Sequence, residues 1–176
     1  MQVRVVFPRR GNSSDTLLAD DLLAATLATG DEGFTVTPLE IVQAYAALAN
    51  GGKLLQPKPY TAGHDPVFVR QVVTPKTAQT MREILRVAVT DGTGKQAATP
   101  SYTTAGKTGS SPLLTGPEGL SSMASFAGFA PLNKSRIAVY VVIENSTSVQ
   151  GGAVAAPVFS RIVEPSLKEL GVAPEL

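Results

Sequence analysis

Apolar and polar residues alternate with a helical period in the first half of the chain and with a strand period in much of the second half. The clearest helix lies in residues 35–52, TVTPLEIVQAYAALANGG. Thr37 is placed to cap its start, Pro38 fits the first turn, and Glu40 completes a capping box. The glycines after Asn50 end the helix. Its predicted core face consists of Ile41, Ala44, Tyr45 and Leu48.

Two more helices are predicted before residue 100. Thr74 and Pro75 repeat the capping device, and the helix that they begin runs to the TDGTG stretch at 90–94. The other helix covers 16–28 and follows a possible short strand at 3–7. Between the helices, GGKLLQPKPY is typical of a turn that leads into an extended, proline-stiffened segment. The apolar stripe of the helix after Thr74 is Ala78, Met81, Leu85 and Ala88.

Three runs after Pro100 are strand-like: SYTTAGKTG at 101–109, SMASFAGFAP at 122–131 and RIAVYVVIE at 136–144. The short PLNKS connection predicts that the last two strands are antiparallel. RIAVYVVIE is apolar almost throughout, which favours a strand covered on both faces. The intervening SSPLLTGPEGLSS is predicted to be a loop.

A closing helix is predicted from about Pro157 to Leu170, with Gly171 as its stop and a kink at Pro165. The fold class is therefore α+β (α/β): an antiparallel sheet of at least three strands flanked by helices. We expect residues 1–176 to form a single domain. The predicted core face of the closing helix is Phe159, Ile162, Val163 and Leu167.

Composition narrows the functions that this fold can serve. The 176 residues are 43% hydrophobic and 16% charged with a net charge of +1, which is typical of a folded globule and gives no basic face for nucleic acid. The longest apolar run, residues 137–143, is too short to cross a membrane. Without cysteine and with a single histidine, His64, interpreted as a loop residue, no metal site is predicted. We predict no cofactor.

Lys107, in YTTAGKTGSS, is the one residue whose surroundings suggest chemistry. A phosphate-binding loop needs a glycine where Ser101 stands and a helix after Thr108, and the sequence offers neither. A solvated lysine at a strand end remains an alternative. The third interpretation is the wall of an acyl-transfer site, in which the ammonium stabilises negative charge and biases proton transfer toward a nucleophile.

The neighbours of Lys107 suit that third interpretation. The hydroxyls of Thr108 and Ser110 can bind a carboxylate. Gly109 carries no side chain, so a peptide can lie along the strand and pair with its backbone. The backbone N–H of Ser110 could then face a developing oxyanion.

Several segments resemble class B penicillin-binding proteins, the D,D-transpeptidases of bacterial cell-wall synthesis. TVTPLEIVQAYAALANGGKL resembles the helix after their second active-site motif, and AGKTGSS resembles their third motif on its strand. SFAGFAP and RIAVYVVIEN resemble the next two strands, and GGAVAAPVFSRIV resembles the start of the closing helix. These segments follow the family's order over roughly residues 30–170, with 1–29 holding the possible strand and helix.

The resemblance implies an incomplete penicillin-binding or serine β-lactamase-like transpeptidase fold. It also implies a reaction: a serine in S-x-x-K is acylated by a peptidoglycan stem peptide, a second peptide amine displaces the enzyme, and β-lactams trap the serine. Lys107 is then the catalytic residue expected in this chain, and Thr108, Gly109 and Ser110 bind substrate. Glu144 and Asn145 lie at most at the cleft's edge. The site implied is on the periplasmic or extracytoplasmic face of a bacterial inner membrane.

Two of the family's motifs are missing from the sequence. No serine is followed three residues later by lysine, and neither S-x-N nor Y-x-N occurs. Ser13-Ser14-Asp15 imitates the second motif but is interpreted as a helix cap. Ser110 stands where the family usually has threonine. We therefore expect a C-terminal part of a transpeptidase domain that is inactive alone. Its missing half is either supplied by a complementing N-terminal fragment, or made unnecessary by adaptation of this chain, or replaced by self-association. The alternatives are a non-catalytic relative that binds stem peptides or a cell-wall partner, and an unrelated α/β protein.

Overall fold

The computed structural model describes residues 36–58, 66–116, 119–144 and 150–176, with side chains except at 111–122. The chain divides into two compact units, Met1–Glu40 and Ile41–Leu176. The predicted strand at 3–7, the helix at 16–28, His64 and Asn145 lie outside the described residues.

Of the first unit, residues 36–40 are described, and they contain the start of helix α2 (Pro38–Ala49). The predicted capping box is present there. Thr37 N donates to Glu40 Oε2 at 2.7 Å, and Glu40 N donates to Thr37 Oγ1 at 3.3 Å. These bonds satisfy amides that would otherwise lack a partner in the first turn of the helix.

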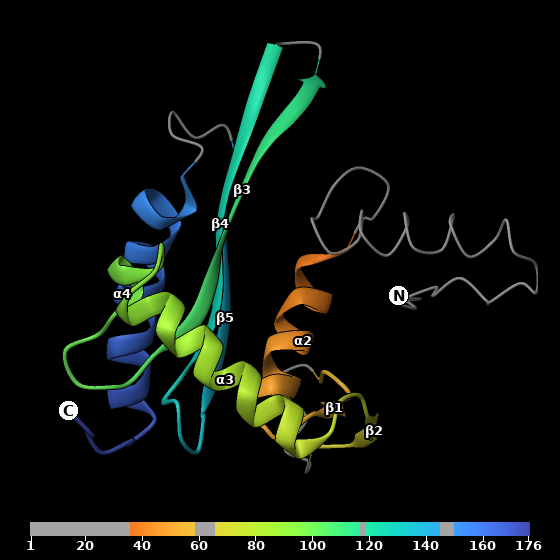
Figure 1. The fold of residues 1–176 in the computed structure, drawn as a ribbon, viewed down its shortest axis with the longest axis vertical. Helices are drawn as coiled ribbons and strands as arrows, with labels where there is room; N and C mark the ends of the chain where they lie inside the picture. Colours follow the sequence, from red (N-terminus) through yellow and green to blue (C-terminus); the bar gives the residue numbers. More distant parts are fainter. Residues whose placement is uncertain (1–35, 59–65, 117–118, 145–149) are drawn as a thin grey trace, which may run out of the picture. The chain divides into compact units, whose positions relative to one another are not determined.

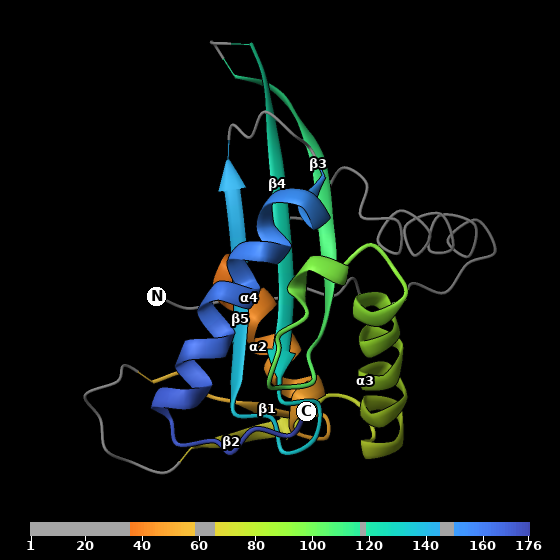
Figure 2. The same cartoon turned by 90° about the vertical axis from the view of Figure 1, so that its left-hand side faces the viewer.

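The second unit holds the rest of the described structure (Figures 1 and 2). Its sheet has the order β3-β4-β5 and is antiparallel throughout. Six predicted elements, two helices, three consecutive strands and a closing helix that follows them, are present in that order. The elements after α2 are β1 (Lys53–Leu55), β2 (Phe68–Gln71), α3 (Pro75–Thr90), the 3₁₀ turn η2 (Lys95–Ala97), β3 (Ala105–Gly116), β4 (Gly119–Ala130), β5 (Ile137–Glu144) and α4 (Gly151–Glu169).

Both faces of the three-stranded sheet carry apolar clusters. On one face, Phe126 of β4 packs against Phe159 of α4, with ring centroids 4.8 Å apart. On the other face, Phe129 of β4 joins Leu85 of α3, and Tyr45 and Leu48 of α2 pack against this cluster. Because side chains on a strand alternate between faces, the two phenylalanines of one strand serve both clusters.

Helices α2 and α3 confirm most of their predicted features. Thr74 Oγ1 caps α3 by accepting from Thr77 N at 3.1 Å, and Ala78 and Leu85 are buried as expected. The α2 core face was partly wrong, because Ala44 is exposed and Ala47 is the buried residue.

The strands differ from their predictions in length and cover. β3 begins at Ala105 rather than 101, and the predicted loop at 110–122 belongs largely to β3 and β4. β5 is covered on both faces, though only partly: Val141 is its only buried residue, Ile137, Val139 and Ile143 pack against one cluster, and Ala138 packs against the other. The strands β1 and β2, which pair with each other, were not predicted as a pair.

Helix α4 starts at Gly151, as the resemblance of GGAVAAPVFSRIV implied, and not at about Pro157, where the local pattern placed it. Phe159, Val163 and Leu167 are buried as expected, but Ile162 is 40% exposed and does not belong to the core face. The helix continues through Pro165 to Glu169. The kink expected at Pro165 stays a prediction.

Candidate functional site

Lys107 lies on a strand at the margin of the sheet. Of the described strands only β4 pairs with β3, so one side of β3 has no strand beside it among the described residues. Lys107 and Ser110 are exposed, and Thr108 and Gly109 are half-buried. The structure thus places the four predicted site residues together on an accessible strand, as the sequence predicted for Lys107.

The register of β3 places these residues on alternate faces. Lys107 is opposite Ala127 and Gly109 is opposite Ser125, while Thr108 is opposite Phe126. Phe126 belongs to the cluster on the α4 face, so Thr108 and Ser110 face α4, and Lys107 and Gly109 face α2.

Lys107 nevertheless reaches Thr108. Its Nζ lies 3.0 Å from both the carbonyl oxygen and Oγ1 of Thr108. A long, flexible side chain can turn toward the strand's own margin in this way. The Lys107 ammonium and the Thr108 hydroxyl are therefore in contact, although the two side chains leave the strand on opposite faces.

Gly109 is held close to β4. A Cβ at this position would lie 2.4 Å from Ser125 Oγ. A side chain here would have to displace that hydroxyl, so glycine permits the close approach.

The N-terminus of α4 packs directly on the strand that carries the site. Gly151 N donates to Ser110 Oγ at 3.2 Å. A Cβ on Gly151 would lie 2.3 Å from Ser125 O and 2.5 Å from Gly109 O, and both are backbone atoms. Only a glycine lets the first turn of α4 approach the sheet this closely. Ser110 thus has its hydroxyl fixed by the helix N-terminus.

The loop after α3 supplies a further hydroxyl. Thr93 Oγ1 lies 2.9 Å from Thr108 Oγ1. The loop is held by Gly94 N, which donates to Ala88 O at 2.9 Å. A Cβ on Gly152 would lie 2.3 Å from Thr93 O, so α4 also packs against this loop.

A cavity of about 460 Å³ opens between these elements. Its lining offers hydroxyls, the Lys95 ammonium and the amide end of a helix, and it contains no Asp or Glu. Such a set of donors favours an anionic group such as a carboxylate. Lys107 is not among the lining residues. The cavity is lined by Thr93, Lys95, Gln96, Thr108, Ser110, Gln150, Gly151, Gly152 and Ala153.

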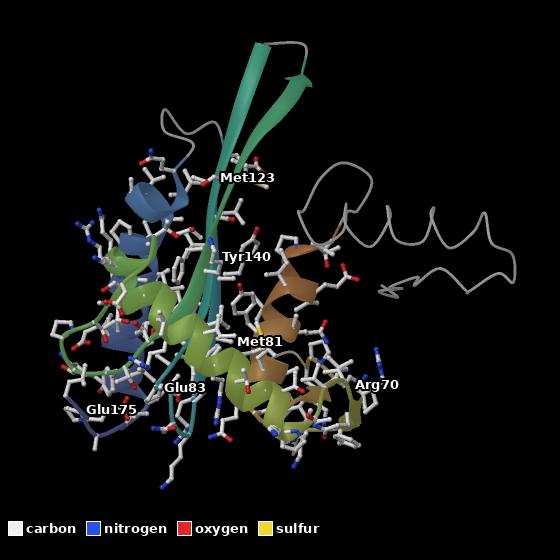
Figure 3. The ribbon with its side chains drawn as sticks, in the orientation of Figure 1. Arg70, Met81, Glu83, Met123, Tyr140 and Glu175 are labelled. Atoms are coloured by element: carbon white, nitrogen blue, oxygen red, sulfur yellow. The ribbon has the colours of Figure 1, made fainter. Side chains whose placement is uncertain are left out.

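Two tyrosines lie on the α2 side of the sheet, Tyr140 of β5 and Tyr45 of α2. Tyr140 of β5 is opposite Ala127, which is itself opposite Lys107, so the small alanine separates the two longer side chains. Figure 3 shows Tyr140 on this part of the sheet. Burial raises the pKa of Tyr45 of α2, and the nearby Tyr140 adds to the effect. The Tyr45 hydroxyl therefore stays protonated in neutral solution.

Sequence reasoning missed Thr93, Lys95, Gly151 and Gly152. The TDGTG stretch was interpreted only as a helix stop, and the glycine pair only as part of a resemblance. Glu144 ends β5 and is exposed. Within the described part of the chain, no group of three or more His, Cys, Asp or Glu side chains could hold a metal ion. No helix in the described ranges combines the length and apolarity needed to cross a bilayer.

Comparison with known proteins identifies the family. The model of the penicillin binding protein transpeptidase domain matches residues 7–164. Stage V sporulation protein D of Bacillus subtilis is 36% identical over 165 residues, covering 85% of this chain and 25% of that protein. Peptidoglycan D,D-transpeptidase FtsI of Escherichia coli is 33% identical over 161 residues, which cover 88% of this chain and 27% of that protein. The chain thus spans about a quarter of the length of these two relatives.

A solved structure agrees with the sequence match. The apo transpeptidase domain of Burkholderia pseudomallei penicillin-binding protein 3 superposes with a TM-score of 0.70 at 32% identity, covering 83% of this chain and 46% of that one. The chain belongs to the penicillin-binding protein transpeptidase domain family.

Proposed function

We propose that this chain supplies the Lys107 wall of a peptidoglycan D,D-transpeptidase site. The observation that carries the proposal is the position of Lys107 on an accessible marginal strand of a chain in this family. Lys107 stabilises developing negative charge and favours proton transfer at a neighbouring nucleophile. Thr108 and Ser110 bind the carboxylate of the substrate, and Gly109 leaves room for its peptide backbone.

The proposed reaction begins at the D-Ala-D-Ala end of a stem peptide. A serine hydroxyl attacks the carbonyl carbon of the penultimate residue, and the terminal D-alanine leaves with its nitrogen protonated. An amine of a second stem peptide then attacks the acyl ester and releases the serine. A β-lactam acylates the same serine without being displaced.

The nucleophile of this reaction must come from outside the printed sequence. The sequence contains no S-x-x-K and no S-x-N. Thr108 and Ser110 bond to Thr93 and to Gly151 rather than to a general base. We therefore propose that the chain alone forms no acyl-enzyme, and that a transpeptidase segment carrying the serine completes the site. The coverage of 46% of the matched Burkholderia domain supports such a segment.

A fluorescent penicillin tests both statements. The purified chain should give no covalent label, whereas mixing it with the serine-bearing part of a related domain should restore labelling. The change Lys107→Ala should abolish the restored label, and Lys134→Ala, at an exposed turn, should not. Stoichiometric labelling of the chain alone would contradict the proposal.

A binding module without catalysis is a second candidate, and the cavity beside β3 favours it. Its donors are assembled by β3, α4 and the Thr93 loop without any further segment. In that case a D-Ala-D-Ala peptide should bind the chain alone. Binding through the cavity should be lost in Lys95→Ala, and binding along the strand should be lost in Lys107→Ala. If isothermal titration calorimetry detects no heat of binding, the binding module is rejected and the transpeptidase wall remains as the proposed function.

The proposed substrates also set the proposed location. Peptidoglycan stem peptides and β-lactams meet their enzymes on the outer side of the cytoplasmic membrane. We accordingly assign the site to the periplasmic or extracytoplasmic face of a bacterial inner membrane, in line with relatives such as FtsI.

A further inference from the structure

The hydroxyl of Thr93 belongs to a chain of polar contacts that ends at the Lys107 ammonium. Lys107 Nζ lies 3.0 Å from Thr108 Oγ1, and Thr108 Oγ1 lies 2.9 Å from Thr93 Oγ1. A threonine hydroxyl has one hydrogen and two lone pairs. Whether Thr108 or Thr93 donates in their mutual bond, Thr108 Oγ1 keeps a lone pair for the ammonium.

Thr93 is exposed, so the strength of its hydrogen bond to Thr108 depends on how firmly the Thr93 loop is held. Three contacts hold the loop. Gly94 N donates to Ala88 O at 2.9 Å, and a Cβ on Gly94 would lie 3.2 Å from the buried ring of Phe126. On the other side, Gly152 of α4 approaches Thr93 O so closely that a Cβ there would lie 2.3 Å away.

The anchoring of the loop bears on the Lys107 ammonium, because that ammonium bonds to the Thr108 hydroxyl. Lys107 and Thr108 point to opposite faces of the sheet, so the lysine must bend over the strand margin to reach the hydroxyl. A Thr108 hydroxyl without a fixed partner rotates freely about its C–O bond and presents its lone pair in many directions. When the Thr108 hydroxyl is bonded to Thr93, its lone pair points in only a few directions.

We propose that Thr93 is a positioning residue, which orients the Thr108 hydroxyl and thereby holds the Lys107 ammonium at the margin of β3. Calling Lys107 a site residue rests on the proposed function. The hydrogen-bond chain itself does not, so its test needs neither a substrate nor an acyl-enzyme.

The test measures the acetylation rate of each lysine with N-hydroxysuccinimidyl acetate by mass spectrometry. The reagent attacks a free amine, so an amine that is held by two acceptors reacts slowly. The change Thr93→Val keeps the shape and removes the hydroxyl. We expect the Lys107 rate to rise about three- to fivefold, a change typical of losing one net hydrogen bond between neutral groups such as the two threonine hydroxyls. Lys76 and Lys134, which are exposed, provide internal references.

Three further variants complete the design. Thr93→Ser keeps the hydroxyl and should restore the slow rate. Thr80→Val removes an exposed threonine hydroxyl that bonds to Lys76 O within α3, and it should leave Lys107 unchanged. Thr108→Val should itself accelerate Lys107, and Thr93→Val should add nothing in that background, because both act through one hydroxyl.

Two results would overturn the proposal. One is that Thr93→Val leaves the Lys107 rate unchanged in the wild-type background. The same conclusion follows if Thr93→Val accelerates Lys107 equally in the wild-type and the Thr108→Val backgrounds. The other is a rise shared by Lys134, which would mean that Thr93 only supports the local fold. A failure of penicillin labelling in the complemented site, with the Lys107 effect intact, would count against the proposed function alone.

Discussion

Glu164 connects α4 to the segment that precedes β3. Its carboxylate accepts from Ser101 Oγ at 2.6 Å and from Ser101 N at 3.3 Å, and Lys168 Nζ lies 2.8 Å away. Desolvation raises the pKa of Glu164, but the hydrogen bonds from Lys168 and Ser101 outweigh it, so the pKa is lowered overall. The bond to Glu164 raises the pKa of Lys168 in turn. The charged form of Glu164 is therefore the stabilising one.

Glu164→Gln should make the free energy of unfolding depend less on pH in the acidic range. A carboxyl whose folded pKa is lowered contributes stability above its unfolded pKa, and the contribution is lost as pH falls through the folded pKa. At neutral pH the variant should be less stable by about 1 kcal/mol, after allowance for solvent screening. The difference should shrink as the pH is lowered below the ordinary range of a glutamate, as measured by urea unfolding.

Glu83→Gln is the matched control for this change. Glu83 pairs with Arg86 on the surface of α3, with a side chain that is 56% exposed. Its loss should change the unfolding free energy little at any pH. Equal pH dependence in wild type and Glu164→Gln would contradict the assignment.

Among the elements, α3 shows how a local signal fixes a boundary. Its cap uses Thr74, whose Oγ1 accepts from Thr77 N, and Pro75 stands in the first turn. All the atoms involved lie within four residues. The sequence is therefore sufficient to predict where this helix begins.

Thr74→Ala should destabilise the protein by about 1 kcal/mol, because one amide in the first turn of α3 loses its acceptor. Urea unfolding followed by circular dichroism measures the change. Thr80→Ala, at an exposed position inside the same helix, should be neutral or slightly stabilising, since alanine has the higher helix propensity. Similar losses for the two variants would show that the cap is not responsible.

Other boundaries depend on contacts between distant residues, and the local signals in the sequence did not predict them. α4 begins at Gly151 because glycine lets its backbone approach Gly109 and Ser125, whereas the local signal pointed to Pro157. β3 continues to Gly116 because its register with β4 continues, with Pro112 opposite Ser122. A proline is tolerated there because β3 has a strand on one side only among the described residues.

The residues of the candidate site also fall into two groups, those that local sequence patterns predicted and those that only the structure revealed. Lys107 and its neighbours were predicted because KTG is a local pattern. Thr93 meets Thr108 across fifteen residues, and Gly151 meets Ser110 across forty-one. No periodicity in the sequence connects such pairs, so the partners of the predicted residues required the structure.

On the scale of the whole molecule, the described three-stranded sheet has an apolar cluster on each face, and α3 contributes Val89 to one cluster and Leu85 to the other. Phe159 of α4 is fully buried against Phe126, and Val163 and Leu167 extend this cluster along the helix. The cluster holds α4 on the sheet. Through Gly151 the same helix also fixes the hydroxyl of Ser110.

Phe159→Ala should cost about 3–5 kcal/mol of unfolding free energy, because it removes a large buried ring and leaves a cavity. Ile162→Ala is the matched control on the same helix, since Ile162 is 40% exposed and the sequence had assigned it to the core. Its loss should stay below about 1 kcal/mol. Chemical denaturation compares the two, and comparable losses would contradict the observed face of α4.

The last residues of the chain lie beside the segment that leads into β3. Glu175 N and Leu176 N both donate to Ser101 O, at 2.9 and 3.3 Å, and Thr103 N donates to Glu175 Oε1 at 2.9 Å. An affinity tag fused directly after Leu176 would therefore emerge next to the strand whose lysine is to be assayed. Protein for the reactivity measurements should carry its purification handle at the other terminus, or have it cleaved off.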